Sequence, residues 1–284
     1  MRHIVIIGLG SAGYAALMTI RRTAPKTRIT VIDPKRSDLM HPCGIPYALG
    51  GHVPVAGLEQ DIFLSKMSVE KLAGKASRID GEARSVTVHT DDGERVISYD
   101  AAIIATGSVP AIPPIAGVER TLYNGLYPLA TVDDLKKIQD RLDSSVRGVV
   151  VGAGAIGLEA AIGLRKHLRA VTLFEMKPQV LPGILDPEMS VPVREHLEFH
   201  GIELITGASI DGILGGDAFA GVTSGPMKYD AEIGILSAGF RANTEAAAGS
   251  GITLESSGIT VNERMQTSLP GVYAAGDCTA AWSV

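Results

Sequence analysis

The sequence contains little of what marks disulfide-rich, membrane-spanning or nucleic-acid-binding proteins. Its 284 residues include two cysteines, too few for a disulfide framework. No apolar stretch reaches the roughly 18 residues of a membrane span, and the N-terminal apolar run is too short for a signal peptide. Lys and Arg form no basic run, and the formal net charge is -5. These absences favour a cytoplasmic protein whose partners are small molecules, with no membrane, nucleic-acid or metal site.

Glycine, in contrast, is abundant, and its first cluster follows an apolar strand. Residues 4–7 predict a buried strand, "GLGSAG" at 8–13 a tight turn into a helix, and "RITVID" at 28–33 the next strand. Asp33 comes 33 − 13 = 20 residues after the last glycine of the motif, the spacing of a dinucleotide-binding unit. In this context ordinary turn glycines are the weaker alternative. The predicted ligand-binding residues of this segment are Gly8, Gly10, Ser11, Ala12, Gly13 and Asp33.

The same pattern recurs in the second half of the chain. "GVVVGAGAIG" ends at Gly157, and Glu175 closes the following strand 175 − 157 = 18 residues later. Two similar segments, "YDAAIIATG" at 99–107 and "YDAEIGILSAG" at 229–239, predict the closing strand of each half. The residues expected to contact ligand in these segments are Ala105, Thr106, Gly107, Gly152, Gly154, Ile156, Gly157, Glu175 and Gly239.

The intervening segments indicate how the two halves are organised. Alternating residues around an Asp-Asp-Gly turn predict an antiparallel β-meander at 76–100, and the proline-rich stretch 108–117 predicts a linker. The glycine-rich stretch 211–230 predicts a hairpin and loop in the second half. We therefore expect an α/β fold with a first domain at 1–110, a second at 111–241, and a return to the first domain at 242–284.

The ordered motifs resemble those of the flavin-dependent pyridine nucleotide–disulfide oxidoreductases. The two GxGxxG motifs, the "ATG" at 105–107 and the "AAGD" at 274–277 fall in family order. The resemblance implies two Rossmann-like domains of the FAD/NAD(P)-binding, three-layer ββα type. It places FAD on the first domain, completed by Gly276 and by Asp277 at the start of a final helix, and NAD(P)H on the second, with Glu159 near the nicotinamide. Glu175 favours NADH, because a carboxylate accepts from a free 2′-hydroxyl and repels the 2′-phosphate of NADPH, which stays the alternative.

The stretch "HPCGIPYALGG" at 41–51 contains the candidate redox residue. Family members with two redox cysteines have a C-x4-C pair, but the fifth residue after Cys43 is Ala48. The stretch is similar to the single-cysteine branch, the coenzyme A-disulfide reductases, NADH oxidases and peroxidases, which implies that Cys43 cycles through a mixed disulfide, a persulfide or a sulfenic acid beside the flavin. Pro46 suits the first turn of a helix, whose dipole would favour the Cys43 thiolate. Pro42 is expected to contact the flavin.

Further residues, both within this stretch and elsewhere in the sequence, are candidates for a functional or a structural role. His41 is a candidate for proton transfer, or a solvated loop side chain, and Tyr47 either shapes the flavin pocket or belongs to the core. Cys278 is expected to be a buried, unreactive residue. Arg21 and Arg22 suit the end of a helix, or the phosphates of a substrate resembling coenzyme A. Ser11 occupies the place of a histidine in peroxidase members, which counts against peroxide as the substrate.

The resemblance therefore predicts an enzyme that passes electrons from NADH through FAD and Cys43 to a disulfide, persulfide or polysulfide, with O2 as a competing acceptor. The alternatives are a binding module without full catalytic competence and an NADH-dependent reductase of a protein electron carrier. Family members continue into a C-terminal domain that forms a homodimer, whereas this sequence stops at "AAWSV". We accordingly expect a truncated second part of the FAD domain, with exposed apolar surface near Trp282.

Overall fold

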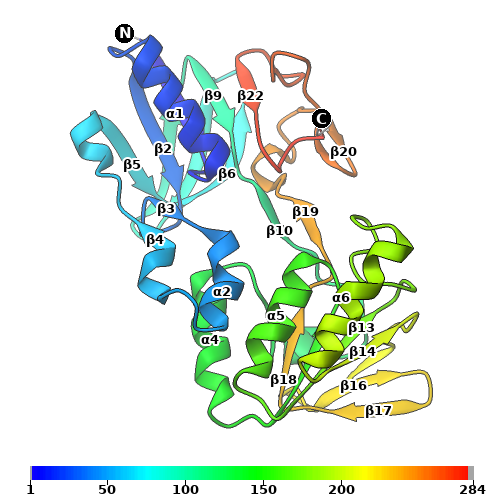
Figure 1. Ribbon diagram of the computed structural model, residues 1–284. Helices are drawn as coiled ribbons and strands as arrows, with labels where there is room; N and C mark the ends of the chain where they lie inside the picture. The colour runs from blue at the N-terminus through cyan, green and yellow to red at the C-terminus, as the bar shows by residue number, and fades with distance from the viewer. Residues whose placement is uncertain (1, 281–284) are drawn as a thin grey trace. The chain divides into compact units, whose positions relative to one another are not determined.

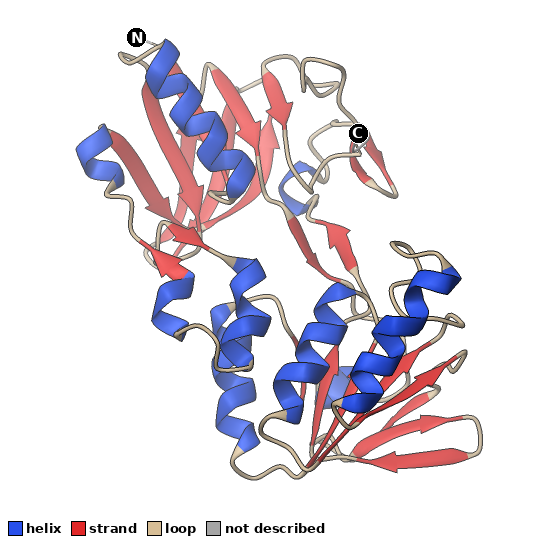
Figure 2. Ribbon diagram, in the orientation of Figure 1, coloured by secondary structure: helices blue, strands red, loops and turns tan. Residues whose placement is uncertain are grey.

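The computed structural model describes residues 2–280 and divides them into two compact units. Unit 1 contains residues 2–40, 59–109 and 241–280, and unit 2 contains residues 41–58 and 110–240. Each unit has its own parallel sheet with helices on one face (Figures 1 and 2). The chain passes between the units at β10 (Ser108–Pro110) and β19 (Phe240–Ala242), among other points. Trp282 lies outside the described residues.

The sheet of unit 1 has five parallel strands in the order β22-β9-β1-β2-β5. Their bounds are β1 His3–Ile7, β2 Arg28–Asp33, β5 Val69–Ala73, β9 Ala101–Ile104 and β22 Val272–Ala274. Ile4 aligns with Ile29 of β2 and with Ala101 of β9, so β1 lies in the middle of the sheet. A central parallel strand is covered on both faces, which explains the continuous apolar run at residues 4–7.

Alternate side chains of β1 enter two different cores, which makes unit 1 a three-layer structure. Ile6 packs with Leu17 of α1 (Ser11–Thr23) in one cluster. Val5 and Ile7 point to the opposite face and pack with Val86 of β7 in another cluster. That layer is the antiparallel sheet β6-β7-β8, with bounds Lys75–Asp80, Ser85–Thr90 and Gly93–Ser98, which confirms the meander expected at 76–100. The remaining elements are β3 Leu39–Met40, β4 Glu59–Gln60, η3 Leu64–Met67, η4 Glu245–Ala247, β20 Leu254–Glu255 and β21 Gly258–Ile259.

Unit 2 repeats this arrangement. Its parallel sheet has the order β11-β18-β12-β13-β14, in which β12 and β13 hold the places of β1 and β2. The bounds are β11 Leu126–Pro128, β12 Arg147–Val151, β13 Ala170–Glu175, β14 Ile202–Thr206 and β18 Ile233–Leu236. The helices are η1 Pro42–Gly44, α2 Ile45–Leu49, η2 Val55–Leu58, α3 Val118–Thr121, α4 Val132–Leu142, α5 Ala155–Arg165 and α6 Pro187–Phe199.

The glycine-rich stretch 211–230 forms three antiparallel strands, where a hairpin and loop was expected. β15 (Gly212–Leu214) pairs with β16 (Gly221–Ser224), which pairs with β17 (Met227–Asp230). Ile213 and Val222 are buried in one cluster with Phe174 of the parallel sheet. This burial stabilises β15 as a third strand, although its three residues are too few for the sequence pattern to predict a strand.

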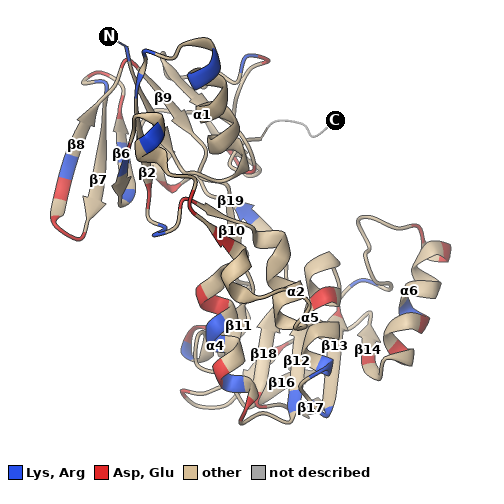
Figure 3. Cartoon of the chain, turned by 60° about the vertical axis from the view of Figure 1, so that its left-hand side comes forward, with Lys and Arg blue, Asp and Glu red and all other residues tan. Residues whose placement is uncertain are grey.

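Charged residues of both signs lie close together on several elements. Acidic and basic residues are interspersed along α4, α6 and β8 (Figure 3). Within residues 2–280, none of the helices combines the length and the apolar character needed to cross a bilayer.

Candidate functional site

The glycine turn between β1 and α1 contains two glycines that packing requires and one that faces open space. Gly8 has φ of 96°, and a Cβ there would overlap the carbonyl oxygen of Ala105. A Cβ at Gly13 would overlap the carbonyl oxygen of Gly8. At Gly10, in contrast, nothing lies within 4 Å of an added Cβ. Packing therefore gives no reason for glycine at position 10, whereas close approach of a ligand to the backbone does.

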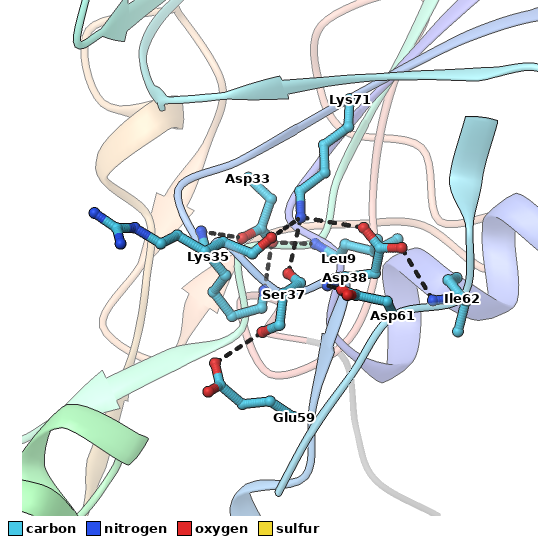
Figure 4. A network of polar contacts seen from close by, with 10 residues as sticks. Leu9, Asp33, Lys35, Ser37, Asp38, Glu59, Asp61, Ile62 and Lys71 are labelled. Atoms are coloured by element: carbon cyan, nitrogen blue, oxygen red, sulfur yellow. Dashed lines mark hydrogen bonds and ion pairs between the residues drawn. The ribbon is translucent and has the colours of Figure 1, made fainter. Parts of the chain in front are cut away.

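Asp33 lies at the end of β2 beside this turn and is only 2% exposed. Its Oδ2 accepts from the Leu9 backbone N–H at 2.6 Å and pairs with the Lys35 ammonium at 2.6 Å (Figure 4). Its Oδ1 accepts from the Lys35 backbone N–H at 2.8 Å. These bonds hold the carboxylate at the glycine turn, with acceptor capacity left for ribose hydroxyls.

A cavity of about 210 Å³ opens at Asp33 within unit 1. Gly8, Asp33 and Thr106, all expected from the sequence, line it. Lys35, Asn243 and Glu245 also line the cavity, although no motif in the sequence singled them out. The sequence could have indicated Lys35, because it follows Asp33 by two residues. It could not have indicated Asn243 and Glu245, which are more than 200 residues away from Asp33 along the chain.

A second polar network fixes the chain after Asp33. The Lys71 ammonium donates to the Ser37 carbonyl at 2.8 Å and pairs with Asp38 at 3.2 Å (Figure 4). Asp38 in turn accepts from the Ile62 backbone N–H at 3.0 Å. The loop between β2 and β3 is thereby tied to the segment that follows β4.

The C-terminal segment of unit 1 lies beside the same glycine turn. A Cβ on Gly276, whose φ is 83°, would meet Cβ of Ala12 at 2.8 Å. The exposed Asp277 accepts from the Ser108 hydroxyl at 3.2 Å, and Thr106 donates to the Asn243 carbonyl at 2.6 Å. The helix expected from Asp277 onward is a turn over residues 276–279, and its continuation falls on residues that the structure does not describe.

The glycine turn between β12 and α5 in unit 2 likewise contains two glycines that packing requires and one that faces open space. A Cβ at Gly152 would overlap the Ser237 carbonyl oxygen, and one at Gly157 the Gly152 carbonyl oxygen, but Gly154 faces open space. A cavity of about 650 Å³ lies at this turn. Among the residues predicted from the sequence, its lining includes Gly152, Gly154, Ile156, Glu175 and Gly239.

Glu175 is the counterpart of Asp33, at the end of β13 and 7% exposed. Its Oε2 accepts from the Ala153 backbone N–H at 2.8 Å, and its Oε1 from the Lys177 backbone N–H at 2.9 Å. The adjacent Met176 is 66% exposed. Glu159 is half-buried on α5 and is not among the described residues that line the cavity. Apolar side chains that the sequence did not single out also line the cavity, among them Pro113, Ile115, Met176, Leu181, Pro182, Ile184 and Phe240.

Cys43 is exposed in the 3-10 turn η1, directly before α2. Pro46 lies in the first turn of α2, as expected, but this helix has only five residues. Ile45 and Leu49 anchor it in unit 2, where they are fully buried. His41 and Pro42 are exposed, and Tyr47 is 50% exposed rather than part of the core.

Two further candidates, Cys278 and Arg21, have structural roles. Cys278 is fully buried, with its Sγ 3.5 Å from the Ile104 carbonyl oxygen, which confirms the interpretation as a packed residue. The Arg21 guanidinium donates to the backbone carbonyls of Pro25, Thr27, Met67 and Ser68. With these donors occupied, Arg21 holds α1 against the neighbouring loops rather than offering a phosphate site.

Comparisons with known proteins identify relatives over nearly the whole chain. The sequence model of the family "Pyridine nucleotide-disulphide oxidoreductase" matches residues 2–283. The chain is 35% identical to an NADH oxidase of Methanocaldococcus jannaschii, covering 96% of this chain and 62% of that protein. It is 31% identical to a CoA-dependent NAD(P)H sulfur oxidoreductase of Pyrococcus abyssi, covering 97% of this chain and 62% of that protein. A solved NAD-dependent persulfide reductase from A. fulgidus matches with a TM-score of 0.92 and 32% identity, over 98% of this chain and 53% of that one. The chain thus spans less than two thirds of these relatives.

Proposed function

Because the chain belongs to the pyridine nucleotide-disulphide oxidoreductase family, we propose that it is the dinucleotide-binding part of an NADH-dependent reductase of sulfur substrates. The substrate is a disulfide, persulfide or polysulfide, and Cys43 is the thiol that attacks it. The names of the relatives, which include a sulfur oxidoreductase and a persulfide reductase, support this substrate class. The observation that carries the proposal is that Cys43 is exposed while Cys278 is fully buried.

The residues present fit the cofactors of this family, FAD and NAD(P)H. In unit 1, Gly10 leaves room for a diphosphate, and Asp33 is held where it can accept from a ribose. In unit 2, Gly154 and Glu175 offer the same two features at the larger cavity. The buried carboxylate of Glu175 favours NADH over NADPH, because it would repel a 2′-phosphate.

The glycine turn of unit 1 and Asp33 would hold FAD, which would supply the relay for an electron pair from NADH to the sulfur substrate. In this reaction Cys43 acts as the nucleophile. Its thiolate attacks one sulfur of an R–S–S–R′ substrate, which breaks the S–S bond, forms a Cys43–S–S–R bond and releases R′S⁻ to take up a proton. The electron pair from NADH then returns Cys43 to the thiolate and releases RS⁻. O2 competes for the same electrons.

A single-turnover experiment tests the proposal. Dithionitrobenzoate reacts with exposed thiols, so one nitrothiobenzoate group should attach per chain, at Cys43. NADH added anaerobically to this labelled, FAD-loaded protein should release one coloured thiolate per chain. Cys278→Ala is the matched control, and it should label and release like the parent protein. Cys43→Ser should do neither.

The competing functions give different results. If NADH reduces the flavin but the label stays on Cys43, or if the label is lost equally without FAD, Cys43 is not the electron acceptor. An incomplete binding module would give the first of these results. A reductase of a protein electron carrier would transfer electrons to that carrier equally well with Cys43→Ser.

A further inference from the structure

The segment that contains Cys43 is held by the last turn of α5. Gly163 of α5 lies directly against the end of α2. A Cβ on Gly163 would come within 3.1 Å of Leu49 Cγ and 3.3 Å of the Gly50 backbone nitrogen. These distances are tighter than ordinary van der Waals contact, so a larger residue at position 163 would push the segment away.

Two basic side chains just beyond α5 bind the same segment. The Lys166 ammonium donates to the Gly50 carbonyl at 2.9 Å and to Nε2 of His52 at 2.5 Å. Nε2 of His167 lies 2.9 Å from the Leu49 carbonyl oxygen, to which it donates. Leu49 and Gly50 mark the C-terminal end of α2, whose carbonyls have no partners within the helix. Lys166 and His167 therefore supply the donors that this helix end lacks.

The length of α2 makes these contacts important. A helix of five residues is too short to be stable by itself, because helices shorter than about 12 residues form too few hydrogen bonds to offset the cost of nucleation. Its burial against unit 2 and the bonds from Lys166 and His167 must therefore determine where η1 and α2 lie. Cys43 lies in the exposed turn directly before this helix, so the placement of α2 also sets the position of Cys43.

The opposite end of α5 belongs to the dinucleotide cavity. Gly154 is the N-cap of α5, and both Gly154 and Ile156 line the cavity of about 650 Å³. One helix of 11 residues, roughly 16 Å long, thus connects the cavity to the residues that hold the Cys43 segment. This connection is internal to unit 2.

We propose that Lys166, together with His167 and Gly163, is a positioning set that fixes the Cys43 segment on the NAD(P)H-binding unit. These residues act on the thiol through α2 and do not take part in the chemistry. The inference rests on the proposed function only in taking Cys43 as the reactive thiol.

The test compares four variants of the FAD-loaded full chain. Lys166→Met removes the ammonium but keeps the aliphatic stem, and Lys166→Arg restores a cationic donor. Gly163→Ala adds one methyl group under α2 and favours the helical conformation of α5, so it should not unfold the protein. Lys136→Met, at an exposed position on α4, is the matched control for loss of one positive charge in unit 2.

Hydrogen exchange of the Gly50, Gly51 and His52 amides reports on the segment, because all three donate to carbonyls of α2. We expect Lys166→Met to raise their exchange rates about tenfold and Lys166→Arg to restore most of the protection. The NADH-driven release of label from Cys43 should slow at least about threefold in Lys166→Met and in Gly163→Ala, while flavin reduction by NADH stays unchanged. Lys136→Met should match the parent protein in both measurements.

Unchanged exchange and unchanged release in Lys166→Met would overturn the inference, as would equal slowing of flavin reduction and label release. Failure of the proposed function looks different. In that case the parent protein itself releases no label, whereas the exchange of residues 50–52 still responds to Lys166→Met.

Discussion

The glycine turn of unit 1 allows the same change, one added methyl group, to be made at two positions three residues apart with opposite expected results. Gly13→Ala places Cβ against the Gly8 carbonyl oxygen, an overlap that only a backbone shift can relieve. Overpacking of this kind costs about 1–3 kcal/mol, and the better helix propensity of Ala returns at most about 1 kcal/mol. Gly10→Ala meets no protein atom within 4 Å, and φ of −89° at Gly10 is open to any residue. Its expected cost to the apoprotein is about 0.5 kcal/mol, because Ala is a poorer N-cap than Gly.

The order reverses for cofactor affinity. If the diphosphate of FAD approaches the backbone at Gly10, the methyl group meets it directly. An overlap worth about 1–3 kcal/mol weakens binding about five- to 150-fold. Urea unfolding of the apoproteins and fluorescence titration of FAD measure the two quantities separately. Gly10→Ala should unfold close to the parent protein but bind FAD poorly, and Gly13→Ala should unfold at clearly lower urea.

Unchanged FAD affinity in Gly10→Ala would refute the argument that open space at this glycine marks the ligand path. Loss of apoprotein stability equal to that of Gly13→Ala would refute it as well. Gly154→Ala and Gly157→Ala form the matched pair in unit 2, with NADH as the ligand.

Three further predictions concern single side chains. Glu175→Gln keeps an acceptor for the Ala153 N–H but removes the negative charge. The ratio of NADH to NADPH affinity, measured by calorimetric titration, should therefore fall at least about tenfold. An unchanged ratio would mean that Glu175 does not contact the 2′-position of the ribose. Burial raises the pKa of Glu232, but its hydrogen bonds with the Arg147 guanidinium and with two backbone N–H groups outweigh this effect and hold the pKa below 4.5. The contribution of Glu232 to the free energy of unfolding is therefore present above pH 4.5 and is lost as the pH falls through the folded-state pKa. Urea curves of Glu232→Gln and the parent protein should differ at pH 7 and converge in acid, and a pH-independent difference would contradict this assignment. Arg21→Met deprives four backbone carbonyls of their donor and should lower the free energy of unfolding by about 2–3 kcal/mol; a change below about 0.5 kcal/mol would indicate that water replaces the guanidinium.

The sequence alone determined the repeated architecture and the positions of both acidic residues. Continuous apolar runs indicate central parallel strands, and a glycine turn followed by Asp33 or Glu175 is a local pattern with a local cause. The meander at 76–100 was readable for the same reason, since alternation and a turn signal lie within a few residues of each other. The isolation of Cys43 from a second thiol was also visible in the sequence.

Only the tertiary structure decided which residues distant in sequence meet. Asn243 and Glu245 line the cavity at Asp33, and Ile213 makes β15 a strand because a buried cluster holds it. Residues 41–58 lie in the sequence between two segments of unit 1 but belong to unit 2, since Gly163 of α5 and Lys166 directly after it fit the end of α2. Local patterns record what a residue needs from its near neighbours in the chain. Contacts between residues more than 100 positions apart depend on shape and hydrogen-bond complementarity, which exist only after the chain has folded.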